Sequence, residues 1–435
     1  LCQHLSYRPR ASFSSMTQAL SSIEPLAVSA MTATTALGAG CQPLLAALRA
    51  GRSGLKPCDF ETARLPTWIG EAPGIDSATL PAALAAYDCR NQRLAWLGLQ
   101  ADGFLQAARA AIARYGADRV ALALGTSTSG ILSTELAYRE RGADGALPAW
   151  FDYRATHNTG SLTAFVREAL GLRGPALTLS TACSSSAKVF AAAQRMMAAG
   201  LADAAIVGGV DSMCLTTLYG FASLQLTAPE PCRPCDAQRQ GLSIGEAAAF
   251  ALLERPGAAS GDADGAGGVM LAGWGESSDA HHMSSPHPEG AGARAAMRQA
   301  LERAGLRPAD IGYINLHGTA TQANDAAEAA AISALFGPGH AGSGVPCSST
   351  KGMTGHTLGA AGAVEAVICA LALRHGLLPA SVGTRQPDAA LALNVVMQPT
   401  PAPGLRHALS NSFGFGGSNA SLVFSLSRPD GEAAC

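Results

Sequence analysis

Cys183 stands between an apolar run and a helix-like stretch. The run occupies residues 176–179, Cys183 lies in the sequence TACSSS, and an alanine-rich stretch at 187–199 follows, closed by Gly200. This pattern predicts a strand, a turn and a helix, with Cys183 at the turn. Unpaired backbone N–H groups and the positive end of the helix dipole favour a thiolate there. A free cysteine is more often a small buried hydrophobe, so a nucleophilic role for Cys183 requires partner residues.

Two histidines in glycine-punctuated turns could be those partners. His317 follows the apolar run 313–316 and opens the sequence HGTAT, and His356 ends the sequence KGMTGH, which begins at Lys351. Loops of this kind commonly carry chemistry. A lone loop histidine is usually structural, but two of them, one with a lysine five residues before it, favour a catalytic interpretation of Cys183.

Four motifs occur in one order along the chain: TACSSS at 181–186, HGTAT at 317–321, KGMTGH at 351–356 and NSFGFGGSN at 411–419. Together they resemble the β-ketoacyl-[acyl-carrier-protein] synthases of the Cys-His-His type, over about residues 26–426. The resemblance implies the thiolase fold, an α/β fold of two similar βαβαβ-type halves packed as a layered sandwich. It also implies a dimer with active sites near the subunit interface.

The resemblance assigns the chemistry residue by residue. Cys183 would attack an acyl thioester delivered by an acyl carrier protein, and the N–H groups of Cys183 and Phe415 would stabilise the oxyanion. His317 and His356 would hold the enolate oxygen that forms when a malonyl thioester loses carbon dioxide. The carbanion would then attack the acyl group on Cys183 and give a β-ketoacyl product.

Lys351 is expected to set the electrostatics around the two histidines, and Glu328 is expected to pair with it. A structural ion pair is the alternative for both residues. The resemblance requires no metal and no bound organic cofactor, because the phosphopantetheine arm arrives on the carrier protein in its acyl and malonyl forms.

The remaining site residues come from the HGTAT and NSFGFGGSN motifs. Thr319 and Thr321 match threonines that contact the phosphopantetheine arm in the family. Phe413 and Phe415 are expected either to gate the acyl pocket or to fill the core, and Phe415 also supplies its backbone N–H group.

Composition agrees with such an enzyme. The 435 residues are 48% hydrophobic and only 14% charged, which indicates a large core, two fused halves and an interface with another subunit. The net charge of −2 and the lack of a basic run interleaved with aromatics argue against nucleic acid as a partner. Eleven scattered cysteines fit a reducing compartment, the cytoplasm. Cys232 and Cys235 form a lone CxxC, for which we expect no metal.

Alternating apolar runs and alanine-rich stretches predict an α/β chain. We expect strands at 120–124, 176–179, 204–210, 313–316, 407–410 and 420–426, and helices at 187–199, 293–304, 325–335 and 358–373. The expected parts are a disordered extension at 1–24, an N-terminal half at 25–265 ending in the boundary region Pro256–Gly268, a C-terminal half at 266–428 and a tail at 429–435. The extension could also be an organellar transit peptide. No apolar run of about eighteen residues is apparent, so no membrane-spanning helix is expected.

Departures from the family pattern bear on the pathway. Gln322 stands where a proline often follows HGTxT, and Leu242 ends a sequence that replaces an acidic-Gly-Phe run. These changes leave open a specialised polyene or polyketide branch besides housekeeping fatty acid synthesis.

Two alternatives to the synthase are a non-catalytic chain-length partner subunit of a ketosynthase heterodimer, and a thiolase or Cys-His-Asn enzyme acting on coenzyme A esters. The intact cysteine and histidines argue against both. The dimer is expected to be a homodimer, with a heterodimer as the alternative.

Overall fold

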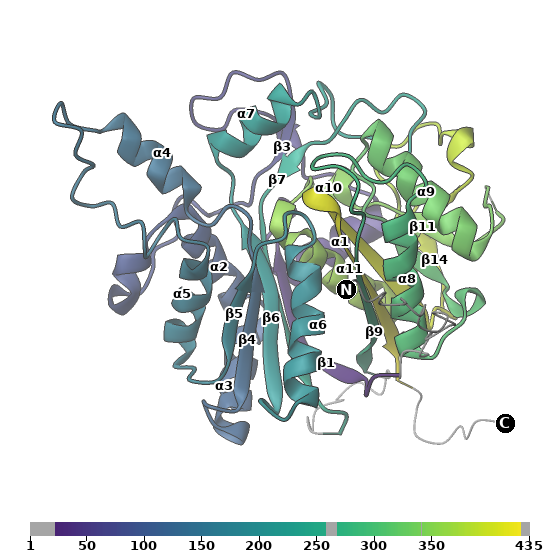
Figure 1. Ribbon diagram of the computed structural model, residues 1–435, viewed down its shortest axis with the longest axis horizontal. Helices are drawn as coiled ribbons and strands as arrows, with labels where there is room; N and C mark the ends of the chain where they lie inside the picture. The colour runs from purple at the N-terminus through teal and green to yellow at the C-terminus, as the bar shows by residue number, and fades with distance from the viewer. Residues whose placement is uncertain (1–21, 258–267, 341, 428–435) are drawn as a thin grey trace, which may run out of the picture.

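The computed structural model describes residues 22–257, 268–340 and 342–427 (Figure 1). The strands are β1 Leu26–Thr34, β2 Lys56–Pro57, β3 Trp68–Gly70, β4 Val120–Gly125, β5 Ala176–Leu179, β6 Ala204–Asp211, β7 Ile244–Gly245, β8 Ala247–Glu254, β9 Val269–Ser278, β10 Tyr313–Asn315, β11 Pro346–Ser348, β12 Leu377–Leu378, β13 Asn394–Val395, β14 Thr400–Pro401, β15 His407–Gly414 and β16 Ser418–Leu426. The α-helices are α1 Cys41–Ala50, α2 Arg90–Gln100, α3 Phe104–Tyr115, α4 Ile131–Arg139, α5 Gly160–Leu170, α6 Ser185–Ala198, α7 Leu215–Ser223, α8 Ala291–Ala304, α9 Gln322–Phe336, α10 Lys351–Thr354 and α11 Ala361–His375.

The long strands form one sheet that passes through both halves of the chain. Its order is β13-β11-β10-β15-β16-β9-β1-β8-β6-β4-β5. The two halves meet where β1 pairs with β9 over only two residues, Leu26 and Ala27. Strand β5 ends the sheet at the N-terminal side, where it pairs with β4 alone.

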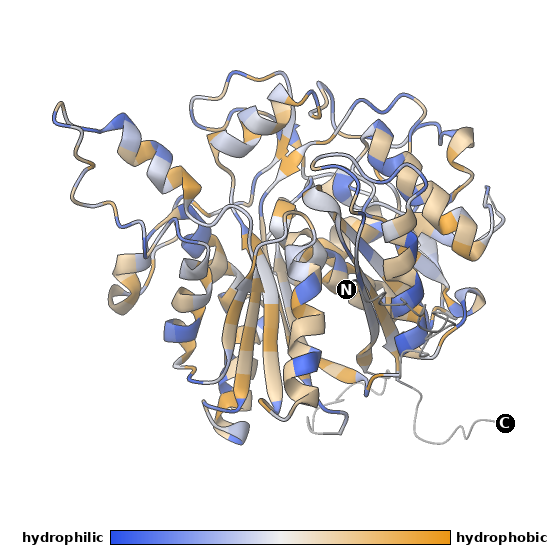
Figure 2. Ribbon diagram, in the orientation of Figure 1, coloured by the Kyte–Doolittle hydropathy of each residue, from blue (hydrophilic) through white to orange (hydrophobic). Residues whose placement is uncertain are grey.

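Side chains alternate across the N-terminal strands and separate two cores. On β4, Val120, Leu122 and Leu124 face a core shared with the outer helices α2, α3 and α5, whereas Ala121 and Ala123 face a core shared with α6 and α11. This is the two-residue period of a strand buried on both faces. Figure 2 shows the orange apolar strands at the centre and blue polar residues on the outward helices. On the C-terminal side, α8 and α9 cover the outer face.

Helices α6 and α11 therefore occupy the middle layer, between the two halves of the sheet. Small residues allow the close approach that this layer requires. A side chain at Gly125 would lie 2.4 Å from the backbone nitrogen of Ser186, and one at Gly362 would lie 2.5 Å from that of Ala187. The start of α6, which follows Cys183, is thus fixed by backbone contacts from two other elements.

The expected strands and helices are all present, with ends that differ by a few residues. The layered α/β sandwich is confirmed. The expected boundary Pro256–Gly268 falls mostly in residues 258–267, which lie outside the described residues, as do most of the extension and the tail.

The expectation about apolar runs was wrong for one segment. Residues Leu358–His375 have a mean hydropathy of 1.4 over eighteen residues, enough to cross a membrane by length and composition. Within the protein, 89% of this window is buried, because it forms the short 3-10 helix η4 (Leu358–Ala360) and the central helix α11. It is accounted for as a core helix.

Candidate active site

Cys183 lies in a tight turn between β5 and α6. Ala182, directly before it, has a φ of 52°, a left-handed conformation that few alanines adopt. The turn is tied by the Thr181 N–H, which donates to Ser185 Oγ at 2.9 Å. Gly414 approaches from the C-terminal half so closely that a side chain there would lie 2.7 Å from the Thr181 carbonyl oxygen. This geometry buries Cys183, leaving it 6% exposed.

His356 is held against the cysteine by its own backbone. Its N–H donates to the Ser243 carbonyl at 2.7 Å, and its carbonyl accepts from the Gly245 N–H at 2.9 Å. The imidazole Nε2 then lies 2.9 Å from Cys183 Sγ. The two groups are therefore close enough to exchange a proton.

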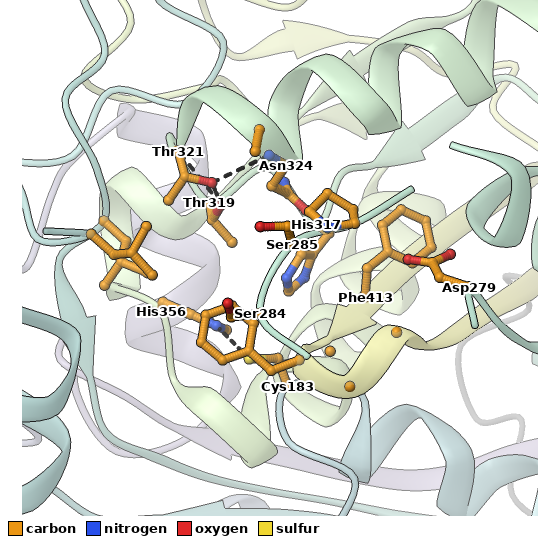
Figure 3. Close-up of a pocket in the computed structure, with 18 of the residues that line it drawn as sticks. Cys183, Asp279, Ser284, Ser285, His317, Thr319, Thr321, Asn324, His356 and Phe413 are labelled. Atoms are coloured by element: carbon orange, nitrogen blue, oxygen red, sulfur yellow. Dashed lines mark hydrogen bonds between the residues drawn. The ribbon is translucent and has the colours of Figure 1, made fainter. Parts of the chain in front are cut away.

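His317 completes the group from the end of β10. Its ring centroid lies 5.3 Å from that of His356, and Lys351 Nζ lies 3.5 Å from its Nδ1. Because an ammonium group only donates, Nδ1 accepts and the proton of a neutral His317 is on Nε2. Figure 3 shows the side chains of Cys183, His317 and His356 close together in the pocket.

Burial governs the protonation of these groups. Burial and the nearby Lys351 ammonium hold the pKa values of His317 and His356 well below the usual histidine range, and the His356 ring adds to the effect on His317. Both rings are neutral at physiological pH, which suits hydrogen-bond donors to an enolate.

The expected thiolate at Cys183 was wrong for the free enzyme. Burial raises the pKa of the Cys183 thiol to about 12, although the Lys351 charge and the backbone N–H groups of Phe415 and Cys183 lower it. The desolvation that comes with a closed turn outweighs the expected effect of the helix N-terminus. The thiol must therefore lose its proton during acyl transfer.

The chain matches the β-ketoacyl synthase N-terminal domain family over residues 23–259 and the C-terminal domain family over residues 269–385. It belongs to the β-ketoacyl synthase family. The enzyme is an acyltransferase that condenses an acyl group with a malonyl unit, with loss of carbon dioxide, in fatty acid or related polyketide biosynthesis.

Individual relatives cover nearly the whole synthase. Nodulation protein E of Rhizobium sp. (strain N33) is 35% identical over 397 residues, which are 89% of this chain and 96% of that protein. The 3-oxoacyl-[acyl-carrier-protein] synthase 2 of Coxiella burnetii is 34% identical over 409 residues, 89% of this chain and 95% of that protein. The solved ketosynthase ApeO of Xenorhabdus doucetiae, in complex with its chain length factor ApeC, is 38% identical with a TM-score of 0.81, and the match covers 93% and 98% of the two chains.

The expected pairing of Glu328 with Lys351 was wrong. Lys351 Nζ instead contacts the Glu365 carboxylate, and both side chains are at most 3% exposed. Glu365 is the one charged residue in the apolar stretch 358–373. Because a charge in a buried helix needs a partner, this position was a signal that the sequence reasoning missed.

Glu328 holds the synthase's HGTAT loop through hydrogen bonds to the loop backbone. Its carboxylate accepts from the N–H groups of His317 at 2.9 Å and Gly318 at 2.8 Å, and from the Asn411 side chain at 3.0 Å. Burial raises the pKa of Glu328 to about 7, although these bonds lower it. Glu328 therefore positions His317 through the backbone and has no contact with the lysine.

The raised pKa of Glu328 has a consequence for stability. In the unfolded chain the carboxyl group ionises near 4.5 and in the folded synthase near 7, so the folded state binds more protons between these values. Stability from this group is present below pH 4.5 and is lost as the pH rises to 7. We expect the wild type's advantage in unfolding free energy over Glu328→Gln to fall by about 3 kcal/mol across this range. Urea unfolding at several pH values measures it; a difference that does not vary with pH would contradict the assignment.

The rest of the pocket extends from Cys183 towards the surface. Thr319 and Thr321 line it, with their hydroxyl groups 3.0 Å apart. The Phe413 ring lies 5.8 Å from that of His317 and is 9% exposed, so it is a buried wall residue. Phe415 is 36% exposed and stacks on Phe221 of α7 at 5.6 Å. All the predicted residues except Lys351 and Glu328 thus line one cavity. Those two residues contact His317, which is part of the cavity wall.

A second loop of the synthase borders this cavity, and the sequence reasoning did not include it. Asp279 and the serines 284–285 line the pocket. The Asp279 N–H donates to the Gly417 carbonyl at 2.8 Å, and the Gly416 N–H donates to the Met283 carbonyl at 2.7 Å. The glycine loop that carries Phe415 is therefore held by this second loop.

Among the described residues of the synthase, Cys183, His317 and His356 form a group that could hold a metal ion by distance alone. Their ligand atoms lie within 4.8 Å of one another. The Lys351 ammonium beside His317 opposes a bound cation. The set is better suited to nucleophilic and hydrogen-bonding catalysis.

Proposed function

We propose that Cys183 accepts the acyl group from a carrier-protein thioester and that His317 and His356 serve the malonyl half-reaction. In acyl transfer, the Cys183 sulfur bonds to the acyl carbon, the thioester bond to pantetheine breaks, and the cysteine proton passes to the departing thiol. The N–H groups of Cys183 and Phe415 hold the oxyanion. Both backbone N–H groups lower the pKa of the Cys183 thiol, and Phe415 lines the cavity with Cys183, which supports this assignment.

The malonyl group then loses carbon dioxide, and the resulting enolate keeps its negative charge on the thioester oxygen. His317 donates to that oxygen through Nε2, because Lys351 faces its Nδ1. His356 is the second donor. The carbanion bonds to the acyl carbon on Cys183, the cysteine thioester breaks, and a β-ketoacyl thioester two carbons longer leaves on the carrier protein.

The observation that carries this proposal is the contact of His356 Nε2 with Cys183 Sγ at 2.9 Å, with His317 and Lys351 beside it. Thr319 and Thr321 would contact the phosphopantetheine arm along the cavity (Figure 3). The arm belongs to the acyl carrier protein, so the enzyme would need neither a resident metal nor an organic cofactor.

The partner of this chain would be a second subunit of the same fold. Strand β5 is an unpaired sheet edge with half-buried Leu177 and Leu179. Helix α4 and the loop after it project from the body (Figure 1), and Tyr138, Trp150 and Tyr153 on this arm are more than half exposed. Apolar edges and aromatic patches of this kind usually mark an interface. The ApeO ketosynthase was solved with a chain length factor, so a heterodimer is the form to test against a homodimer.

A specialised pathway is favoured over housekeeping fatty acid synthesis. Leu242, which replaces a common phenylalanine, is 3% exposed and lines the cavity. The exchange of an aromatic ring for a smaller side chain changes the shape of the site where the substrate binds. The cytoplasm suits this chain, since nine cysteines of the described residues are free thiols.

Mass spectrometry tests the function directly. The protein, alone and with a candidate chain-length subunit, is mixed with malonyl-carrier protein and a panel of acyl-carrier proteins. Acylated Cys183 and a β-keto product two carbons longer are expected. Neither species with any acyl group, under both conditions, would indicate a non-catalytic chain-length subunit instead.

The division of labour gives a separate prediction for His356→Ala. Without this donor the enolate loses one of its two hydrogen bonds, and we expect malonyl decarboxylation to slow by about a hundredfold. Acyl transfer to Cys183 keeps the N–H groups of the oxyanion hole and should slow by less than about tenfold. Release of labelled carbon dioxide and acylation of Cys183 are measured separately. The reverse order of the two effects would show that the roles are assigned wrongly.

A further inference from the structure

Helix α7 supplies part of the wall beside the nucleophile. Its Phe221 lines the cavity with Cys183 and stacks on Phe415, with 5.6 Å between the ring centroids and 25° between the planes. Phe415 lines the same cavity as Cys183. The position of α7 is therefore coupled, through the Phe221 and Phe415 rings, to the wall beside the reacting sulfur.

Helix α7 is only partly buried. Of its nine residues only Leu218 is buried. A polar tie comes from the Tyr219 hydroxyl, which accepts from the Arg64 N–H at 3.1 Å. A helix with so little buried surface depends strongly on the groups that fix its ends.

Glu135 of α4 fixes the first turn of α7. Its Oε2 accepts from the Leu215 N–H at 3.0 Å, and its Oε1 accepts from the Thr216 N–H at 2.7 Å and the Thr216 hydroxyl at 2.6 Å. These backbone donors have no partner within the helix, and the carboxylate charge is favourable at the positive end of the helix dipole. Leu132 of α4 lies in the same apolar cluster as Leu218 of α7.

We propose that Glu135 is a positioning residue that holds Phe221 against Phe415 and so limits access to Cys183. The inference rests on the proposed role of Cys183 but not on the carrier protein, the acyl chain or the condensation. Because α4 also begins the exposed arm (Figure 1), the same contact joins that arm to the wall of the cavity.

The test measures how fast iodoacetamide and N-ethylmaleimide alkylate Cys183, resolved by peptide mass spectrometry in the full-length chain. Glu135→Gln keeps the shape but exchanges one accepting oxygen for an amide that donates. We expect it to speed alkylation by about fivefold, the size of one lost charge-assisted hydrogen bond. Thr216→Val removes only the hydroxyl contact and should change the rate less than about twofold. Cys41 on helix α1, which does not line the cavity, is the internal reference thiol.

A double-mutant cycle separates positioning from general loosening. If Glu135 acts through Phe221, then Glu135→Gln has no further effect in a Phe221→Ala background. A fivefold effect that persists in that background, or an equal rise at Cys41, would overturn the proposal. An equal effect of Thr216→Val would also overturn it, since the N–H contacts would then be irrelevant. Condensation activity is not needed for any of these measurements, so their failure is distinct from failure of the proposed function.

Discussion

Replacement of Cys183 by alanine is expected to abolish condensation while leaving the fold intact. The variant loses the sulfur that must carry the acyl group, and no other described thiol reaches the cavity. Covalent catalysis by an activated nucleophile is worth several orders of magnitude, so we expect at least a thousandfold loss of turnover. Formation of the β-keto product from acyl- and malonyl-carrier proteins measures it.

The small size of alanine suits this position. Cys183 is buried in a turn whose shape depends on Ala182 and Gly414 rather than on the sulfur, so the melting temperature should change by no more than a few degrees. Cys58→Ala, at a half-buried cysteine outside the cavity, is the control and should keep full activity. Turnover by Cys183→Ala at the wild-type rate would defeat the assignment of the nucleophile.

Glu365→Ala is expected to be the most destabilising of the single changes considered. It leaves the Lys351 ammonium without its carboxylate partner at a site where both side chains are at most 3% exposed. Breaking a buried ion pair from one side costs about 3–5 kcal/mol, because the remaining charge is neither solvated nor paired. The free energy of unfolding in urea measures the loss.

Two further variants test whether the loss of stability in Glu365→Ala comes from the unpaired buried charge. Asp118→Ala breaks an ion pair with Arg173 in which both side chains are about two-thirds exposed. It should change the free energy of unfolding by too little to measure. The double change Lys351→Met with Glu365→Leu removes both charges and should recover most of the lost stability. It should not recover condensation, because His317 then lacks the ammonium that fixes its proton on Nε2. If Glu365→Ala were as stable as Asp118→Ala, the pair would not be the buried anchor described here.

Residues that lie within a motif were predictable from the sequence. Cys183 and His317 each follow an apolar run and His356 precedes one, all three lie in short loops whose order along the chain matches the family, and the structure brings them together. The strand and helix around Cys183 follow from hydrophobic periodicity, which is why their limits were close to the observed ones.

Pairings between distant segments were not predictable in the same way. Glu328 and Glu365 lie on different helices at similar separations in sequence from the catalytic loops, and only the packing of α11 in the middle layer decides which carboxylate meets Lys351. The prediction that Cys183 is ionised was wrong for a related reason. A helix N-terminus can be read from a sequence, but the burial that opposes its effect arises from Gly414 and other residues of the C-terminal half.

The edge strand β5 has a practical consequence for work with this protein. A short apolar edge with free N–H and C=O groups is a template for strand addition by any other chain. If a second subunit covers β5, as proposed above, then the same edge is exposed when the protein is produced without that subunit, and aggregation competes with assembly. If that subunit is a different chain, production of both chains in one cell, rather than mixing of purified chains, is the route to an active preparation.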